Sequence, residues 1–79
     1  MKLTVIGAGS WGTALAIHFA RHGNEVAVWA RNARHIQTLA EERENKRYLP
    51  GFPLPESIGL HTDLGEALQG SELVLVVTS

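Results

Sequence analysis

Three closely spaced glycines lie at a point where the chain could bind phosphate. Gly7, Gly9 and Gly12 stand between an apolar run, residues 2–6, and a helix-like segment, residues 12–22. Gly7 permits a tight turn, Gly9 lets a pyrophosphate approach the backbone, and Gly12 lets the helix lie close to a sheet. The unpaired amides and the positive dipole end of that helix would then face the phosphates. The spacing predicts a dinucleotide-binding turn.

A second candidate contact follows the next predicted strand, residues 25–30. An acidic residue at this place would bind a ribose 2′-hydroxyl and favour NAD. This chain instead has Arg31 and Asn32, with Arg34 one turn further on. An arginine can hold a 2′-phosphate through forked, charge-assisted hydrogen bonds. Arg31 therefore points to NADP or to tolerance of both cofactors, and Arg34 is a weaker candidate. The alternative is that both arginines are solvated charges.

Other residues that could do chemistry give weaker signals. Tyr48 and Phe52 lie in a proline-rich loop, residues 48–55, where they could contact a ligand or pack the loop onto the domain. His18 and His22 are four apart on a helix, but no third metal ligand accompanies them. No Ser-His-Asp arrangement can be argued either. We therefore expect no metal site and no catalytic residue in this chain.

Alternating strands and helices must position these residues. Strands are predicted at 2–6, 25–30, 57–62 and 73–77, and helices at 12–22, 33–46 and from about 63 to Gly70. The pattern predicts an α/β fold, a partial Rossmann-type parallel sheet in the order third, second, first, fourth, with helices on both faces. The ligand crevice should lie where the first and fourth strands diverge, beside Thr78 and Ser79.

Periodicity predicts the buried face of each helix. These faces are Gly12, Leu15, Ala16, Phe19 and Ala20 in the first helix, Ile36, Leu39 and Ala40 in the second, and Leu64, Ala67 and Leu68 in the third. Asn32 is expected to cap the second helix and Thr62 or Asp63 the third. Pro50-Gly51 suits the centre of a type II turn.

The apolar run 73–77 should be a central strand beside the first, with both faces covered. In a chain of this length, however, it would lie at the sheet edge and expose apolar residues. We therefore expect the isolated chain to self-associate or to be only marginally folded.

The composition limits the classes of function that are possible. The chain has 79 residues, a net charge of −1 and no cysteine. This indicates one small globular unit in a reducing cytoplasm, and it gives no support for nucleic-acid binding, a membrane surface or disulfides. No apolar run is long enough to span a bilayer. The length is short for a complete dinucleotide-binding domain, which needs about 150 residues.

Several segments of the sequence resemble a known family. Residues 5–16 are similar to the cofactor turn of bacterial NAD(P)-dependent glycerol-3-phosphate dehydrogenase, in which an aromatic residue typically precedes the third glycine, as Trp11 does here. Residues 28–31 resemble its second strand, and residues 45–51 resemble the loop after its second helix. The resemblance covers the whole chain, but only the first segment and the Tyr-Leu-Pro-Gly segment are specific.

The resemblance implies an enzyme that reduces dihydroxyacetone phosphate to sn-glycerol 3-phosphate with NADPH or NADH, feeding phospholipid synthesis. It implies cofactor contact by Ser10, Trp11 and Arg31, and adds Tyr48. The Ser10 amide and hydroxyl can both donate to phosphate. Trp11, a large side chain at a turn, either covers the cofactor or plugs the sheet.

The resemblance also implies an incomplete enzyme. The family's catalytic lysines, substrate contacts and C-terminal helical domain lie beyond residue 79, so residues 1–79 should be the N-terminal part of the dinucleotide-binding domain and inactive alone. A homo-oligomer is one option for the parent. Two alternatives stay open, namely another dehydrogenase of the same fold, such as a ketopantoate or 6-phosphogluconate type, and a non-catalytic nucleotide-binding module.

Overall fold

A four-stranded parallel sheet forms the centre of the molecule. The computed structural model describes residues 1–77. The sheet contains β1 (Lys2–Ile6), β2 (Glu25–Trp29), β5 (Gly59–His61) and β6 (Leu73–Val76), in the order β5-β2-β1-β6. Because β5 and β6 are the third and fourth predicted strands, the predicted order is confirmed. Thr78 and Ser79, expected beside the crevice, lie outside the described residues.

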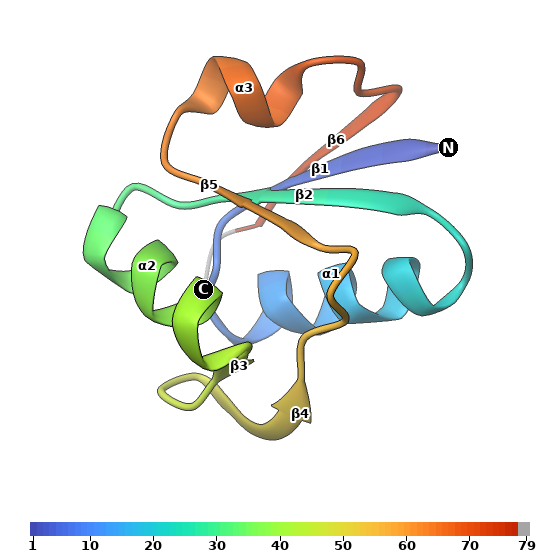
Figure 1. Cartoon of the computed structure of the whole chain (residues 1–79). Coiled ribbons are helices and arrows are strands. Elements are labelled where there is room, and N and C mark those ends of the chain that lie inside the picture. The colour runs from blue at the N-terminus through green and yellow to red at the C-terminus, as the bar shows by residue number, and fades with distance from the viewer. Residues whose placement is uncertain (78–79) are drawn as a thin grey trace.

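Helices lie on both faces of the sheet, as predicted. Figure 1 shows α1 (Ser10–Arg21) and α2 (Ala33–Glu42) on one face and the short α3 (Leu64–Leu68) on the other. A small antiparallel pair, β3 (Glu44–Asn45) and β4 (Leu49–Pro53), lies beyond α1 and α2. This pair was not predicted.

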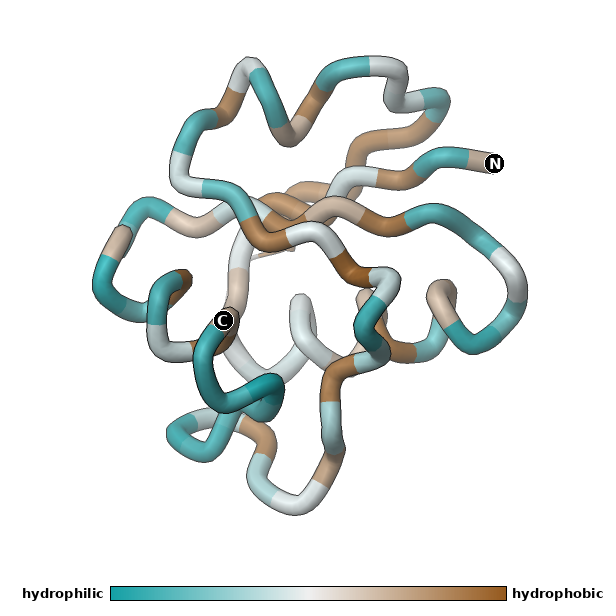
Figure 2. Tube along the Cα trace, in the orientation of Figure 1, coloured by the Kyte–Doolittle hydropathy of each residue, from teal (hydrophilic) through white to brown (hydrophobic). Residues whose placement is uncertain are grey.

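The core lies between the sheet and the helices α1 and α2. Leu3, Thr4 and Val5 are all buried in β1, as expected for a strand covered on both faces. Figure 2 shows hydrophobic residues along the strands and more hydrophilic ones in the connections. The main buried cluster is Val5, Ala8, Ala16, Ile17, Val26, Val28, Ile36, Leu39, Leu54 and Ile58.

The first helix begins two residues earlier than predicted, with Gly9 as its N-cap. Its fully buried residues are Gly12, Thr13, Ala16 and Ile17, whereas the predicted Leu15, Phe19 and Ala20 are only half-buried. The buried face is therefore rotated from the predicted one, because α1 also packs against the β4 segment.

The second helix ends at Glu42 and not at residue 46, so this predicted boundary is wrong. Arg43 takes a left-handed conformation with φ of 53°, and its guanidinium donates to the carbonyls of Pro55 and Ile58. These distant contacts and the pairing of β3 with β4 outweigh the helix propensity of residues 43–46. The predicted buried residue Ala40 is exposed.

The loop predicted at 48–55 contains strand β4. Gly51 has the positive φ, 89°, that the predicted turn would need, but the residues around it pair with β3. The third helix is capped by Asp63, whose carboxylate accepts from the Glu66 amide at 2.8 Å, as predicted. Leu64, however, is 39% exposed and was wrongly placed in the core.

Strand β6 pairs with β1, as predicted, but its two faces are not both covered. Leu73, Val74 and Val76 are exposed, the last at 73%, because β6 forms one edge of the sheet in residues 1–77. No helix in this part of the chain is long and apolar enough to cross a membrane.

Candidate functional site

The glycine turn joins β1 to α1 and has the tight geometry predicted for it. Gly7 has a φ of 123°, a backbone conformation that residues other than glycine rarely adopt. A Cβ there would also lie 2.2 Å from the Val77 carbonyl oxygen. The Gly7 amide donates to the Trp29 carbonyl at 2.8 Å. The turn is therefore held directly against the carboxyl ends of β2 and β6.

Gly12 lies against the turn itself. A Cβ on Gly12 would stand 1.9 Å from the Gly7 carbonyl oxygen and 3.5 Å from Val5 Cγ1. Close packing of the helix was predicted here, and the nearest neighbour is the backbone of the turn rather than the sheet. Only glycine lets α1 begin this close to β1.

The N-terminus of α1 presents backbone donors at the turn. The Thr13 amide bonds the Gly9 carbonyl at 3.0 Å, so the amides of Ser10, Trp11 and Gly12 have no acceptor within the helix. The first turn carries no acidic side chain to offset the helix dipole. This arrangement can bind an anionic group.

Ser10 and Trp11 lie at this helix end. The Ser10 hydroxyl donates to the Tyr48 carbonyl at 2.8 Å, a partner that was not predicted, and its donation to phosphate stays a prediction. Its amide still lies in the first turn. Trp11 is 67% exposed, so the alternative that it plugs the sheet is wrong, and its side chain is available to cover a ligand.

Tyr48 is exposed and packs near two other side chains. Its ring packs edge-on against His35 at 5.4 Å, and the Arg47 guanidinium lies 5.0 Å from its centroid. Through its carbonyl it is tied to Ser10, so the structure does bring Tyr48 to the glycine turn.

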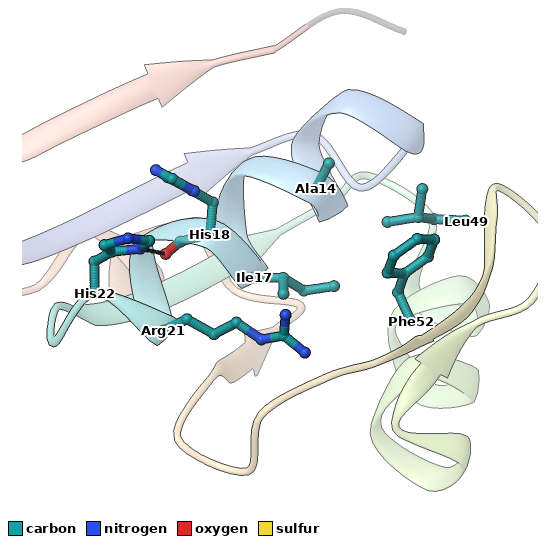
Figure 3. Close-up of a pocket in the computed structure, with 7 residues that line it drawn as sticks. All are labelled: Ala14, Ile17, His18, Arg21, His22, Leu49 and Phe52. Carbon is teal, nitrogen blue, oxygen red and sulfur yellow. Dashed lines mark hydrogen bonds between the residues drawn. The ribbon is translucent and has the colours of Figure 1, made fainter.

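Phe52 lies elsewhere. With Leu49 it lines a pocket of about 310 Å³ along α1, which also includes Ala14, Ile17, His18, Arg21 and His22 (Figure 3). None of the residues predicted to contact the cofactor lines this pocket. The pocket is therefore separate from the glycine turn.

Arg31 and Arg34 are both exposed near the carboxyl end of β2. Arg31 follows Trp29 by two residues, and the Trp29 carbonyl is bonded to the Gly7 amide, so Arg31 is at the same end of the sheet as the turn. Arg34 is in the first turn of α2, which Asn32 caps as predicted by accepting from the His35 amide at 3.1 Å.

Two residues at this site, Asn45 and His35, were not predicted from the sequence. Asn45 is fully buried and donates to the Ala8 carbonyl at 2.9 Å and to Thr13 Oγ1 at 2.7 Å. The His35 ring nitrogen Nε2 contacts the same carbonyl at 3.0 Å. Asn45 stands in a charged stretch that looks like a solvated surface, and its only sequence signal was its place in the segment 45–51.

Among residues 1–77 no three potential metal ligands gather at one place. His22 Nδ1 contacts the His18 carbonyl at 2.7 Å, so one candidate ligand atom is engaged within its own helix.

Comparisons with known proteins fit this geometry. The family model for the NAD-dependent glycerol-3-phosphate dehydrogenase N-terminus matches residues 2–79. A protein of Neisseria gonorrhoeae named glycerol-3-phosphate dehydrogenase [NAD(P)+] is 62% identical over all of this chain, and one of Stenotrophomonas maltophilia with the same name is 51% identical over 98% of it. The chain spans 24% and 23% of these two relatives, respectively.

Solved structures agree. The crystal structure of glycerol-3-phosphate dehydrogenase from Coxiella burnetii superposes with a TM-score of 0.92 at 40% identity, covering 98% of this chain and 24% of that one. The corresponding protein of Plasmodium falciparum gives a TM-score of 0.81 at 28% identity, with the same coverage. These matches decide against the ketopantoate and 6-phosphogluconate types. The chain belongs to the family of the NAD-dependent glycerol-3-phosphate dehydrogenase N-terminus.

Proposed function

We propose that this chain binds NADPH or NADH as the N-terminal cofactor-binding part of an enzyme that reduces dihydroxyacetone phosphate to sn-glycerol 3-phosphate. The observation that carries the proposal is the glycine turn packed against the N-terminus of α1, where Gly12 could not accept a Cβ. The names of the relatives, which specify NAD(P)+, support the same cofactor. A supply of glycerol 3-phosphate for phospholipid synthesis is part of the proposal.

The described residues fit the cofactor. The first-turn amides of α1, including those of Ser10 and Trp11, would hold the pyrophosphate, while Gly7 and Gly9 leave the backbone free of side chains. The exposed Trp11 ring would cover the cofactor, and Tyr48 would lie beside it. When bound, the nicotinamide supplies the hydride.

Arg31 would choose between the two cofactors. It is exposed at the carboxyl end of β2, where a guanidinium can pair with a 2′-phosphate through two hydrogen bonds. NADH lacks that phosphate. We therefore propose that NADPH is preferred and that Arg31 is the reason.

The substrate site and the proton donor are proposed to lie in the part of the relatives that this chain does not span. No catalytic role is proposed for a described residue. A cytoplasmic location and a homo-oligomeric parent remain predictions.

Calorimetric titration of the chain with NADPH and then NADH tests the proposal. Arg31→Asp should weaken NADPH binding by about tenfold or more, because the loss of even one charge-assisted hydrogen bond has about that effect, and change NADH binding far less. Arg21→Asp, an equal charge change at the far end of α1, is the matched control and should leave the preference unchanged. Equal losses of affinity for both cofactors would show that Arg31 does not bind the 2′-phosphate. If the wild-type chain binds neither cofactor, the proposal that this chain binds the cofactor on its own is wrong.

A further inference from the structure

We propose that Asn45 is a positioning residue for the phosphate-binding turn, because it sets the direction of the peptide group between Ala8 and Gly9. The inference rests on the proposed cofactor function. It adds a residue that contacts no cofactor atom and acts only through the backbone of the turn.

Asn45 connects three segments through one buried side chain. Its Nδ2 group donates one hydrogen to the Ala8 carbonyl at 2.9 Å and the other to Thr13 Oγ1 at 2.7 Å. Its Oδ1 atom accepts from the Tyr48 amide at 3.2 Å. An amide has two donor hydrogens, so all three bonds form together. The side chain therefore ties the glycine turn, the first turn of α1 and the Tyr48 segment to one point.

The orientation of the Asn45 amide follows from its neighbours. A flipped amide would face the Ala8 carbonyl with an oxygen and the Tyr48 N–H with an NH₂ group, which pairs acceptor with acceptor and donor with donor. Burial makes both mismatches costly because no solvent can relieve them. Nδ2 is thus the atom that holds Ala8.

A second donor completes the contact at the Ala8 carbonyl. His35 Nε2 lies 3.0 Å from the same oxygen, and because a carbonyl can only accept, Nε2 carries the proton. The two donors come from β3 and α2 and use both lone pairs of the oxygen. The oxygen is therefore held toward these two elements.

Holding this oxygen orients the next amide. In a planar trans peptide the C=O of one residue and the N–H of the next point in opposite directions, and no cis peptide bond occurs in residues 1–77. The Gly9 N–H is thus directed away from Asn45 and His35. The Ala8 carbonyl oxygen, which would repel a phosphate, is at the same time turned away from the side toward which the Gly9 N–H points.

The test compares two buried polar residues. Thr4 is the matched control, because it is also fully buried and its hydroxyl donates to a backbone carbonyl, that of Ala67, at 2.7 Å. The Thr4 hydroxyl bonds Ala67 in α3, which lies on the face of the sheet opposite α1, and it also contacts the Ser71 hydroxyl. Among the described residues it makes no hydrogen bond to residues 7–12. Thr4→Val should therefore reproduce the loss of a buried hydrogen bond without disturbing the turn.

Affinities are measured by NMR titration with NADPH, ADP and adenosine 2′-monophosphate at a temperature where circular dichroism shows each variant folded. Asn45→Ala should weaken NADPH and ADP, which carry a pyrophosphate, by about tenfold and leave the monophosphate, which lacks one, within about twofold. Thr4→Val should change all three equally or not at all. Equal loss for all three ligands in Asn45→Ala would overturn the inference, since that is the signature of a general structural role.

Two further measurements keep the inference testable. His35→Ala removes the other donor to the Ala8 carbonyl, from a half-buried site, and it replaces Asn45→Ala if that variant does not fold. It should likewise weaken NADPH and ADP but not the monophosphate, and equal loss for all three ligands would again overturn the inference. If the wild-type chain binds none of the nucleotides, the proposed function fails for this chain. Amide order parameters then test separately whether Asn45 holds the turn: greater mobility of Gly9 in Asn45→Ala but not in Thr4→Val supports that role, and an unchanged Gly9 overturns it.

Discussion

Replacing Gly12 by alanine should destabilise the chain, although the same change favours most helices. The added Cβ would stand 1.9 Å from the Gly7 carbonyl oxygen and 2.8 Å from its carbon. Real Cβ atoms do not approach other atoms closer than 3.0 Å, so α1 and the turn must separate by about 1.1 Å. Because these two close neighbours are backbone atoms of a tight turn, no side chain can swing aside to make room.

The magnitude follows from two opposing effects. Overpacking costs about 1–3 kcal/mol, while alanine in place of glycine stabilises a helix by up to about 1 kcal/mol. A net loss of about 1–2 kcal/mol in unfolding free energy would lower the melting temperature by roughly 4–16 °C for a domain of this size. A displacement near 1 Å at the phosphate site should also weaken NADPH binding by about tenfold or more.

Thermal unfolding followed by circular dichroism measures the first effect, and titration with NADPH measures the second. Gly65→Ala is the matched control, because Gly65 is in the first turn of α3 and its Cβ would meet nothing closer than the Asp63 carboxylate at 3.3 Å. That variant should melt within a few degrees of the wild-type temperature, because its one close neighbour is a side-chain carboxylate that needs to shift by only a few tenths of an ångström. If Gly12→Ala is as stable as the wild type and binds NADPH equally well, the close approach at Gly12 does not have the role argued for it.

Two further predictions concern exposed residues. Trp11→Ala should change the unfolding free energy by less than about 0.5 kcal/mol, because the side chain is 67% exposed, yet weaken NADPH binding; unchanged binding would show that Trp11 does not cover the cofactor. The wild-type chain should self-associate through the exposed apolar edge at β6, and Val76→Lys should shift sedimentation equilibrium toward the monomer. A wild-type chain that stays monomeric and melts at high temperature would contradict the second prediction.

Features encoded by short spacings were predictable from the sequence. Gly7, Gly9 and Gly12 between a strand and a helix predicted the turn, because its geometry depends on neighbouring residues. The strand order followed from alternating elements of the right length, since parallel strands joined by helices have few allowed arrangements. The caps at Asn32 and Asp63 were likewise local.

Features that depend on distant partners were not predictable. Residues 43–46 read as helix, and contacts of Arg43 with Pro55 and Ile58 end the helix instead. Leu64 was placed in the core although its neighbours leave it exposed.

The turn itself shows the same division. Its glycines lie within six consecutive residues, 7–12, but the side chain that orients it, Asn45, is 37 positions from Ala8 and looks like part of a charged surface. The Ser10 hydroxyl, free in the sequence to bind phosphate, is bonded to the Tyr48 carbonyl 38 positions away. Local spacing is enough to shape a backbone turn, whereas burial and the choice of hydrogen-bond partner depend on which distant segments the folded sheet brings together.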